Sequence, residues 1–313
     1  MNDIEYLVHS YFNNNDAHSK VTSSHWQKYG KLQRVTFKTP RGIMTNANKN
    51  EGIGYTFSTL ELKGGGFGDF KKLTIYNLLL NIPIFIYLIL NSWPKLGFKI
   101  FFITLFYTIK SGQIFSNDVT RCALTVDYLK KNIGDLNSKT ITIIGDGYGR
   151  LGCLIKLLFP KSRIIYINLG KTLLFDYYYS FKVFPKLQHK LVKNLIDFTK
   201  DFNYVEAEFY KEFEIKSDVF VNIASMQEMN LEQINDYFIL IKQNPNQLFY
   251  CCNRLSKKLP DNSIINFLEY PWQGFEIIKD GLCPWYQKFP SLKPPFIRKY
   301  DGPIQHRIAK SQN

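Results

Sequence analysis

The sequence has few cysteines, and they do not form a ligand-like or bridging pattern. Five cysteines occur in 313 residues, with no C-x-x-C pair and no histidine at a metal-ligand spacing. A disulfide scaffold or a structural zinc site needs closer and more regular spacing. We therefore expect reduced, buried thiols, no metal site and a cytoplasmic setting.

The chain also lacks export, repeat and nucleic-acid signals. Its first residues, Met1–Tyr6, are acidic and polar where a secretory signal needs positive charge and an apolar run. No repeat, low-complexity tract or nucleic-acid-binding module is visible, so we expect no nucleic-acid partner. The formal charge of +14 still favours anionic partners, such as phosphorylated substrates or an anionic membrane.

One uncharged run, Leu73–Pro94, is long enough to cross a bilayer. Asn77, Asn81, Asn91 and Pro83 interrupt it, and polar groups are costly in hydrocarbon. Core helices, helices lying on a membrane face and a true span stay open, in that order of preference. Association with the inner face of an anionic membrane would then be peripheral.

From Lys139 onward the sequence alternates between strand-like and helix-like segments, which is typical of a parallel α/β sheet. We expect two regions, a polar and helical extension over 1–134 and a Rossmann-like domain over 135–313. Sheet strands are expected at Thr140–Ile144, Arg163–Asn168, Tyr204–Ala207, Asp218–Ile223 and Gln247–Cys252. Two further segments, Ile264–Phe267 and Phe275–Ile278, are candidates for an antiparallel edge.

The first of these strands leads directly into the glycine-rich segment Gly145-Asp146-Gly147-Tyr148-Gly149-Arg150. Glycines allow a sharp strand-to-helix turn and let a ligand approach the backbone at a helix N-terminus. A dinucleotide and S-adenosylmethionine both fit such a turn. The dinucleotide pattern G-x-G-x-x-G is met imperfectly, either shifted to Gly147 or with Arg150 at its third glycine position.

Three segments resemble the sugar O-methyltransferases of bacterial surface-polysaccharide gene sets, which are class I S-adenosylmethionine-dependent enzymes. They are the turn Ile144–Leu151, the segment Tyr166–Leu174, and Phe220–Met229 with its Asn-x-x-Ser-x-Gln-Glu-Met pattern. Tyr270-Pro271-Trp272 agrees as well. The resemblance covers most of residues 138 to 273.

This resemblance implies a class I methyltransferase that uses S-adenosylmethionine and methylates a sugar hydroxyl of a surface-glycan precursor. It implies that Gly145, Asp146, Gly147, Tyr148, Gly149, Asn168 and Asn222 contact the cofactor. It places Ser225 and Gln227 toward the acceptor and offers Glu228 as a catalytic residue.

Two positions depart from the family pattern. Ile143 and Asn168 stand where the family usually has acids, so Asp146 or another residue would have to bind the ammonium group of the cofactor. Two alternatives therefore stay open. They are an NAD(P)-dependent sugar oxidoreductase and a degenerate, non-catalytic methyltransferase-like scaffold.

Removing the proton of a sugar hydroxyl calls for a carboxylate or an imidazole. Glu228 follows a predicted strand end, where open α/β sheets bind ligands, although it could also cap the next helix. His306 lies in a late segment that we expect to be a loop able to fold over the site. The histidines His9, His18, His25 and His189 are expected on the solvated surface. The basic and aromatic stretch from Trp285 to Arg307 suits sugar rings and a diphosphate or phospholipid headgroup.

Overall fold

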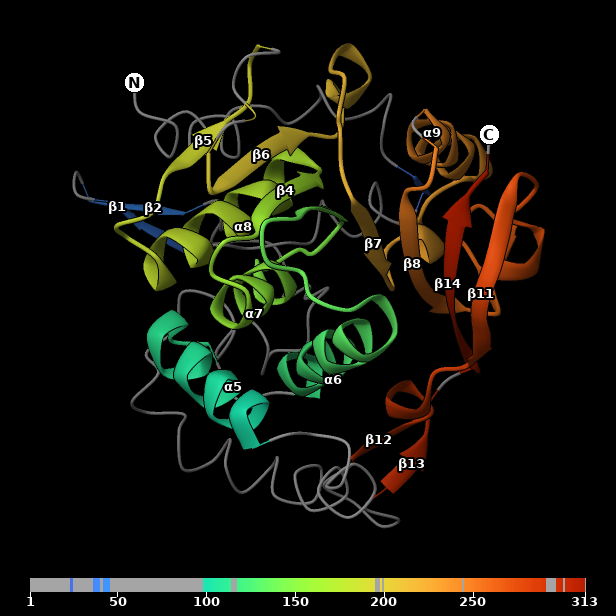
Figure 1. The fold of residues 1–313 in the computed structure, drawn as a ribbon, viewed down its shortest axis with the longest axis horizontal. Coiled ribbons are helices and arrows are strands. Elements are labelled where there is room, and N and C mark those ends of the chain that lie inside the picture. The colour runs from blue at the N-terminus through green and yellow to red at the C-terminus, as the bar shows by residue number, and fades with distance from the viewer. Residues whose placement is uncertain are drawn as a thin grey trace.

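The computed structural model is built around one large, mostly parallel sheet with helices on both faces (Figure 1). The structure describes residues 23–24, 36–39, 42–45, 98–113, 117–194, 198, 200–243, 245–290, 297–300 and 302–312. The predicted run Leu73–Pro94 lies outside these residues, as do His9, His18 and His25. Within the described part of the chain, no helix is long and apolar enough to cross a membrane.

The eight strands of the sheet follow the order β11-β14-β8-β7-β3-β4-β6-β5. Their bounds are β3 Thr140–Ile144, β4 Arg163–Asn168, β5 His189–Leu191, β6 Phe202–Glu206, β7 Val219–Ile223, β8 Leu248–Arg254, β11 Phe275–Leu282 and β14 Ile304–Ser311. The six neighbouring strands β8, β7, β3, β4, β6 and β5 are parallel to one another. Strand β14 runs antiparallel to both β8 and β11. The chain winds outward from β3 in both directions, so a switch point lies between β3 and β7, where such sheets bind ligands.

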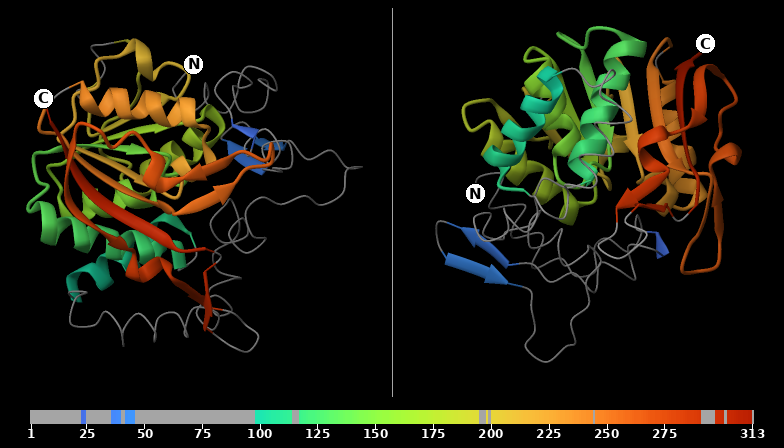
Figure 2. Two further views of the ribbon diagram at one scale, coloured as in Figure 1. Left: turned by 90° about the vertical axis from the view of Figure 1, so that its right-hand side faces the viewer. Right: turned by 90° about the horizontal axis from the view of Figure 1, so that it is seen from below.

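Two layers of helices cover this sheet on opposite sides (Figure 2). The helices are α5 Phe98–Ser111, α6 Asn117–Ile133, α7 Arg150–Leu158, α8 Gly170–Val183 and α9 Leu231–Lys242. Side chains of β4 alternate between the layers, since Ile164 and Tyr166 belong to the core under α5 to α8, and Ile165 and Ile167 to the core under α9. Helices α5 and α6 belong to the same core as the sheet, although they precede the boundary expected at residue 134.

The remaining elements are short. They are the strand pairs β1 Thr36–Thr39 with β2 Gly42–Thr45, β9 Ser256–Lys258 with β10 Ile264–Asn266, and β12 Lys288–Pro290 with β13 Ile297–Lys299, and the 3-10 turns η3 Tyr210–Glu212, η4 Met226–Glu228, η5 Phe267–Glu269 and η6 Pro284–Tyr286. The predicted edge strand at 264–267 was therefore misplaced, because it pairs with β9 outside the main sheet. The second predicted edge strand is β11, and it does pair antiparallel in the sheet.

The prediction of a late loop over residues 302–307 was wrong. Residues from Ile304 onward form β14, which pairs with β8 on one side and β11 on the other. Ile304 and Ile308 belong to the core on the α6 side, and Ala309 to the core on the α9 side. The segment is therefore an interior strand of the sheet, next to the edge strand β11.

Candidate functional site

The glycine turn joins β3 to α7 at the carboxyl end of the central strand. Gly145 and Gly147 have φ angles of 76° and 80°, a region that favours glycine. A Cβ on Gly145 would meet Ser225 Oγ at 2.1 Å, whereas a Cβ on Gly147 would find no atom within 4 Å. Gly145 thus lets β3 approach the end of β7, and Gly147 leaves an open space above the turn.

Asp146 occupies the N-terminus of α7. Its Oδ1 accepts a hydrogen bond from the Arg150 N–H at 3.0 Å and its Oδ2 accepts one from the Gly152 N–H at 3.1 Å. Burial raises the pKa of Asp146 to about 6, although the N–H donors of Gly152 and Leu151 act in the opposite direction. In dinucleotide-binding folds this helix end receives the pyrophosphate, so here a carboxylate stands in the place of an anionic ligand.

Tyr148 also lines the cavity, while its ring packs toward the helices, and Gly149 lies outside the cavity lining. The Tyr148 ring stacks on Phe175 with centroids 5.6 Å apart, and the Arg150 guanidinium lies 4.5 Å from the same ring. A Cβ on Gly149 would meet the Asp176 carbonyl oxygen at 3.0 Å. These two positions therefore hold α7 against α8 and shape the turn from behind.

Asn168 ends β4 and lies beside the turn. Its Oδ1 accepts hydrogen bonds from Leu169 N–H at 3.0 Å and Thr172 Oγ1 at 2.6 Å, and its Nδ2 donates to Asp176 Oδ2 at 2.8 Å. Asp176 is fully buried and also accepts the Gly149 N–H at 2.7 Å. Burial, together with the nearby Asp146 carboxyl group, raises the pKa of Asp176 well above its usual range.

The segment after β7 brings three of the predicted residues to the site. Ser225, Gln227 and Glu228 line the same cavity as the glycine turn. Glu228 Oε1 accepts a hydrogen bond from Lys257 Nζ at 2.8 Å, and Gln227 Oε1 accepts one from the Arg254 N–H at 2.8 Å. The ion pair with Lys257 holds the Glu228 carboxylate at the cavity wall.

Asn222 does not line the cavity. Its Nδ2 donates to the Ile144 carbonyl oxygen at 2.9 Å, and its Oδ1 accepts from Met226 N–H and from Asn253 Nδ2. Asn253 in turn accepts the Gln227 N–H at 3.1 Å. Asn222 therefore links β3, β7 and β8 beneath the site and positions the segment that carries Ser225 to Glu228.

His306 also lies outside the cavity lining. Its ring stacks on Tyr128 with centroids 4.7 Å apart, and Tyr250 Oη lies 3.3 Å from its Nδ1. Burial lowers the pKa of His306 to about 4, against the attraction of Asp280. Because residue 306 belongs to β14, which is paired on both sides, it does not lie in the loop on which its predicted catalytic role depended.

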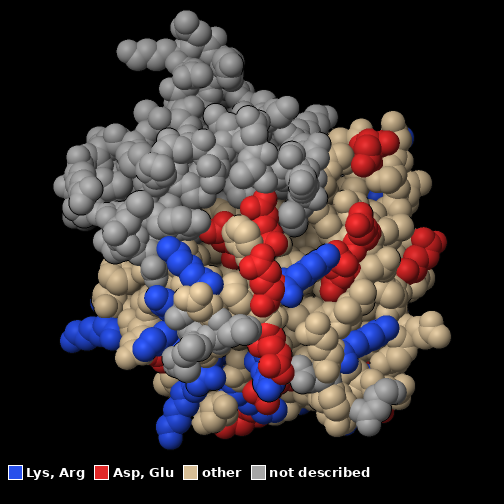
Figure 3. Space-filling view, turned by 90° about the horizontal axis from the view of Figure 1, so that it is seen from above, with Lys and Arg blue, Asp and Glu red and all other residues tan. Residues whose placement is uncertain are grey.

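The cavity has a volume of about 600 Å³ and opens at the carboxyl ends of β3, β4, β6 and β7. Residues of both charges line it, with twice as many carboxylates as cations. The carboxylates are Asp118, Asp146, Glu208, Glu228, Glu232 and Asp236, and the cations are Arg121, Arg150 and Lys211. The positive charge of the chain is thus unevenly distributed, and Figure 3 shows acidic side chains gathered across the middle and right of the face seen from above.

An aromatic wall on the α6 side of the cavity was only partly foreseen. Tyr286 and Tyr300 line the cavity, and the Arg121 guanidinium lies 4.6 Å from the first ring and 5.1 Å from the second. Arg121 also donates to the Trp285 and Lys288 carbonyl oxygens, which fixes the wall in place. Among the described residues, no group of three His, Cys, Asp or Glu side chains could hold a metal ion.

Comparison with known proteins adds structural neighbours only. No protein-family model and no curated protein matches the sequence. Among solved structures, the chain is similar to a proposed RNA methyltransferase from Pyrococcus horikoshii, with 13% identity, a TM-score of 0.41, and coverage of 61% of this chain and 83% of the other. The cyclopropane synthase MmaA2 from Mycobacterium tuberculosis has 12% identity and a TM-score of 0.39, over 50% of this chain and 62% of the other.

A third neighbour is coclaurine N-methyltransferase bound to N-methylheliamine and SAH. It shows 12% identity and a TM-score of 0.37, over 51% of this chain and 50% of its own. At these values the comparison carries no argument about activity. The Rossmann-like fold rests on the strand order and direction of the chain itself, in which β14 is inserted antiparallel between β8 and β11.

Proposed function

We propose that the chain is a class I methyltransferase that transfers a methyl group from S-adenosylmethionine to a sugar hydroxyl of a bacterial surface-glycan precursor. The main observation that supports this choice of cofactor is the Asp146 carboxylate at the N-terminus of α7. It lies in a cavity with more carboxylates than cations. This environment suits a ligand with sulfonium and ammonium groups. It disfavours binding of a diphosphate, because the diphosphate would have to occupy the position that the Asp146 carboxylate holds.

The turn has the space that this cofactor needs. Gly147 presents bare backbone to the cavity, and a side chain there would fill the space. Gly145, Asp146 and Gly147 would hold the methionine part, and the end of β4 with Leu169 and Thr172 would hold the nucleoside part. When bound, S-adenosylmethionine supplies an electrophilic methyl group on its sulfonium.

The residues of the chain act on the acceptor. Glu228 would accept the proton of the acceptor hydroxyl, since a neutral hydroxyl is a poor nucleophile. Lys257 orients the Glu228 carboxylate at the cavity wall. Tyr286 and Tyr300 offer aromatic surface for a sugar ring on the α6 side of the cavity. The resemblance of the segment 220–229 to sugar O-methyltransferases supports the choice of a sugar over other acceptors.

The pyridine-nucleotide alternative has weaker support. An NAD-type enzyme places the pyrophosphate at the N-terminus of α7 and a free acid at the end of the second strand. Here Asp146 fills the first position, and Asn168 fills the second with its side chain bonded to Leu169, Thr172 and Asp176.

Calorimetric titration separates the three candidate functions. We expect S-adenosylhomocysteine to bind while NAD(H) and NADP(H) do not. Binding of a pyridine nucleotide alone would replace the proposal with an oxidoreductase. If none of these ligands binds, the chain is a scaffold with a methyltransferase-like sheet.

A further inference from the structure

Helix α5 carries an exposed apolar stripe that the proposed function does not use. Phe102, Leu105, Phe106 and Ile109 have exposed fractions of 61%, 37%, 46% and 59%. Their spacing of three and four residues places them on one face of the helix. The opposite face, with Ile100, Thr104 and Tyr107, is buried against α6, α7 and α8.

On α5 and α8, the exposed charged side chains that the structure describes are all lysines. Lys99 and Lys110 of α5 are exposed, and so is Lys182 of α8, whose Nζ lies by the end of α5 at Gly112. The Lys110 ammonium lies 5.8 Å from the Phe106 ring centroid, so its stem runs along the apolar surface. Within α5 there is no acidic residue, and the single acid of α8, Asp176, is fully buried.

The position of α5 suits a planar partner. Figure 1 shows the helix at the periphery of the described elements, with α6 and α7 between it and the sheet. Its 14 residues give a length of about 21 Å, short of the roughly 30 Å needed to cross a bilayer. An amphipathic helix with exposed Phe, Leu and Ile beside lysines is typical of one that lies in a membrane interface.

We propose that the α5 face docks the protein on an anionic bilayer. The apolar stripe would enter the boundary between headgroups and acyl chains, while Lys99, Lys110 and Lys182 would contact anionic headgroups. The C-terminal end of α5 is tied to the cofactor turn, because Gln113 accepts from Arg150 Nε at 2.7 Å and donates to the Tyr148 carbonyl oxygen at 3.1 Å. Docking through α5 would therefore hold the cavity close to the lipid surface, whatever reaction it performs.

The first experiment uses a fluorescent label. All five native cysteines are buried, so Ile109→Cys introduces one accessible thiol for an environment-sensitive fluorophore. We expect a blue shift and brighter emission with vesicles of phosphatidylcholine and phosphatidylglycerol in equal parts, and a much smaller change with phosphatidylcholine alone. The matched control is Ile239→Cys on α9, which is similarly exposed, at 61%, on the other side of the sheet and should not respond.

The second experiment measures cosedimentation of the full chain with the same vesicles. Phe102→Glu combined with Phe106→Glu should weaken binding by about tenfold or more, because it replaces two apolar anchors with charges that anionic lipid repels. Ile239→Glu should bind as the unmodified chain does. Thermal unfolding of each variant shows whether its fold is retained.

Four outcomes would overturn the proposal. The unmodified chain fails to bind the vesicles, or the Phe102→Glu, Phe106→Glu variant binds them equally well. The label at residue 109 reports an apolar environment before lipid is added, which would mean that the face is covered by the chain's own residues. The protein forms a dimer that loses its contact on the same substitutions and binds no lipid, which would assign the face to a second copy.

Discussion

The Asn168 amide donates a hydrogen bond to the buried Asp176 carboxyl group, with Nδ2 and Oδ2 2.8 Å apart. This contact gives a physical reason for an amide, and not an acid, at residue 168. A carboxylate at residue 168 would face the fully buried Asp176 carboxyl group at this short distance. The single acid of this pair is Asp176 on α8, which also accepts the Gly149 N–H.

Asn168→Asp should destabilise the protein in a pH-dependent way. The Leu169 N–H and Thr172 hydroxyl can still donate to a carboxylate at residue 168. The substitution therefore removes only the hydrogen bond from Nδ2 to Asp176. At pH 5 the two acids can share a proton, whereas at pH 8 both tend to ionise and repel one another. We expect the free energy of unfolding to fall by about 3 kcal/mol at pH 8 and by clearly less at pH 5, measured by denaturant titration.

The double variant Asn168→Asp, Asp176→Asn is the matched control. It exchanges the amide and the acid and keeps a single carboxyl group in the pair. Its stability at pH 8 should lie well above that of the single variant. If it does not, repulsion between these two groups is not the cause.

Much of the fold could be predicted from sequence because its strands are buried on both faces. The run Ile141–Ile144 is apolar apart from the buried Thr142, as expected for a parallel strand between two helical layers. Strand β14 was missed since it reads Ile304-Gln305-His306-Arg307, where the polar residues find partners that only the folded sheet supplies. Arg307, for example, pairs with Asp280 on β11 at 3.0 Å.

The candidate site was predictable only where backbone shape dictates residue type. The glycines at 145 and 147 have positive φ, which the sequence can signal. Asp176, Asn253 and Lys257 were missed, because each meets its partner through contacts between elements distant in sequence. An acid within the apolar segment Leu173–Tyr179 was the one available signal, since a buried carboxyl group needs donors.

Gly147→Val should abolish binding of S-adenosylhomocysteine while leaving the protein folded. The side chain would project into the open space of the cavity where the cofactor is proposed to lie. Gly134→Val is the matched control, because Gly134 also has positive φ and free space for a Cβ but lies outside the cavity lining. Both variants should lose about 1–3 kcal/mol of stability from backbone strain, and calorimetry should find binding lost only in the first.

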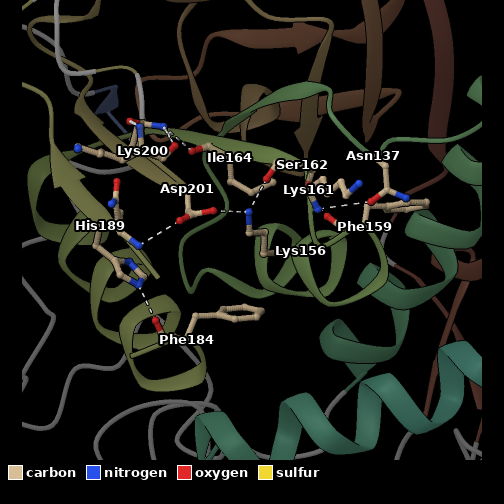
Figure 4. A network of polar contacts seen from close by, with 12 residues as sticks. Asn137, Lys156, Phe159, Lys161, Ser162, Ile164, Phe184, His189, Lys200 and Asp201 are labelled. Atoms are coloured by element: carbon tan, nitrogen blue, oxygen red, sulfur yellow. Dashed lines mark hydrogen bonds and ion pairs between the residues drawn. The ribbon is translucent and has the colours of Figure 1, made fainter. Parts of the chain in front are cut away.

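A polar network at the amino ends of β4 and β6 gives a prediction about stability alone (Figure 4). Lys156 is buried, and its Nζ donates to Asp201 Oδ1 at 2.8 Å and to the Ser162 carbonyl oxygen at 2.6 Å. The neighbouring His189 is half-buried and bonded through both ring nitrogens, to Tyr204 Oη and the Phe184 carbonyl oxygen, so the prediction that it is solvated was wrong. Lys156→Met should destabilise the protein by about 3 kcal/mol and leave cofactor binding intact.

The effect of Lys156→Met should depend on pH. Burial raises the pKa of Asp201, but hydrogen bonds from Lys156 and from the Gln188 N–H outweigh it and leave the pKa below its ordinary value. The stabilisation is therefore present above the ordinary pKa near 4 and is lost as the pH falls through the lowered value. Lys161→Met, at an exposed neighbouring lysine, should change stability by less than about 0.5 kcal/mol at any pH.

The raised pKa of Asp146 predicts that both stability and ligand affinity depend on pH. Its raised pKa, about 6, means that the folded chain without ligand keeps this proton to higher pH than the unfolded chain, so stability falls as the pH rises from about 4 through 6. A cationic ligand prefers the ionised carboxylate. S-adenosylmethionine should therefore bind up to about tenfold more tightly at pH 7 than at pH 5. Adenosine, an uncharged control ligand, should show a smaller change. Asp146→Asn should remove the difference, and an unchanged pH dependence in that variant would place its origin elsewhere.

Glu228→Gln tests the proposed base, with the sugar acceptor taken from a screen of nucleotide-linked and lipid-linked sugars on the unmodified chain. Removal of a positioned base typically costs 10²–10⁴-fold in rate, so S-adenosylhomocysteine formation should slow by about that factor. Calorimetry should show nearly unchanged cofactor affinity, because the ion pair with Lys257 lies at the cavity wall beyond the glycine turn.

His306→Ala is the paired variant. It removes a buried ring packed on Tyr128 and Trp285, so we expect lower stability but near-normal turnover. A loss of turnover confined to His306→Ala would move the base to β14, and normal turnover in both variants would leave Glu228 as a structural partner of Lys257.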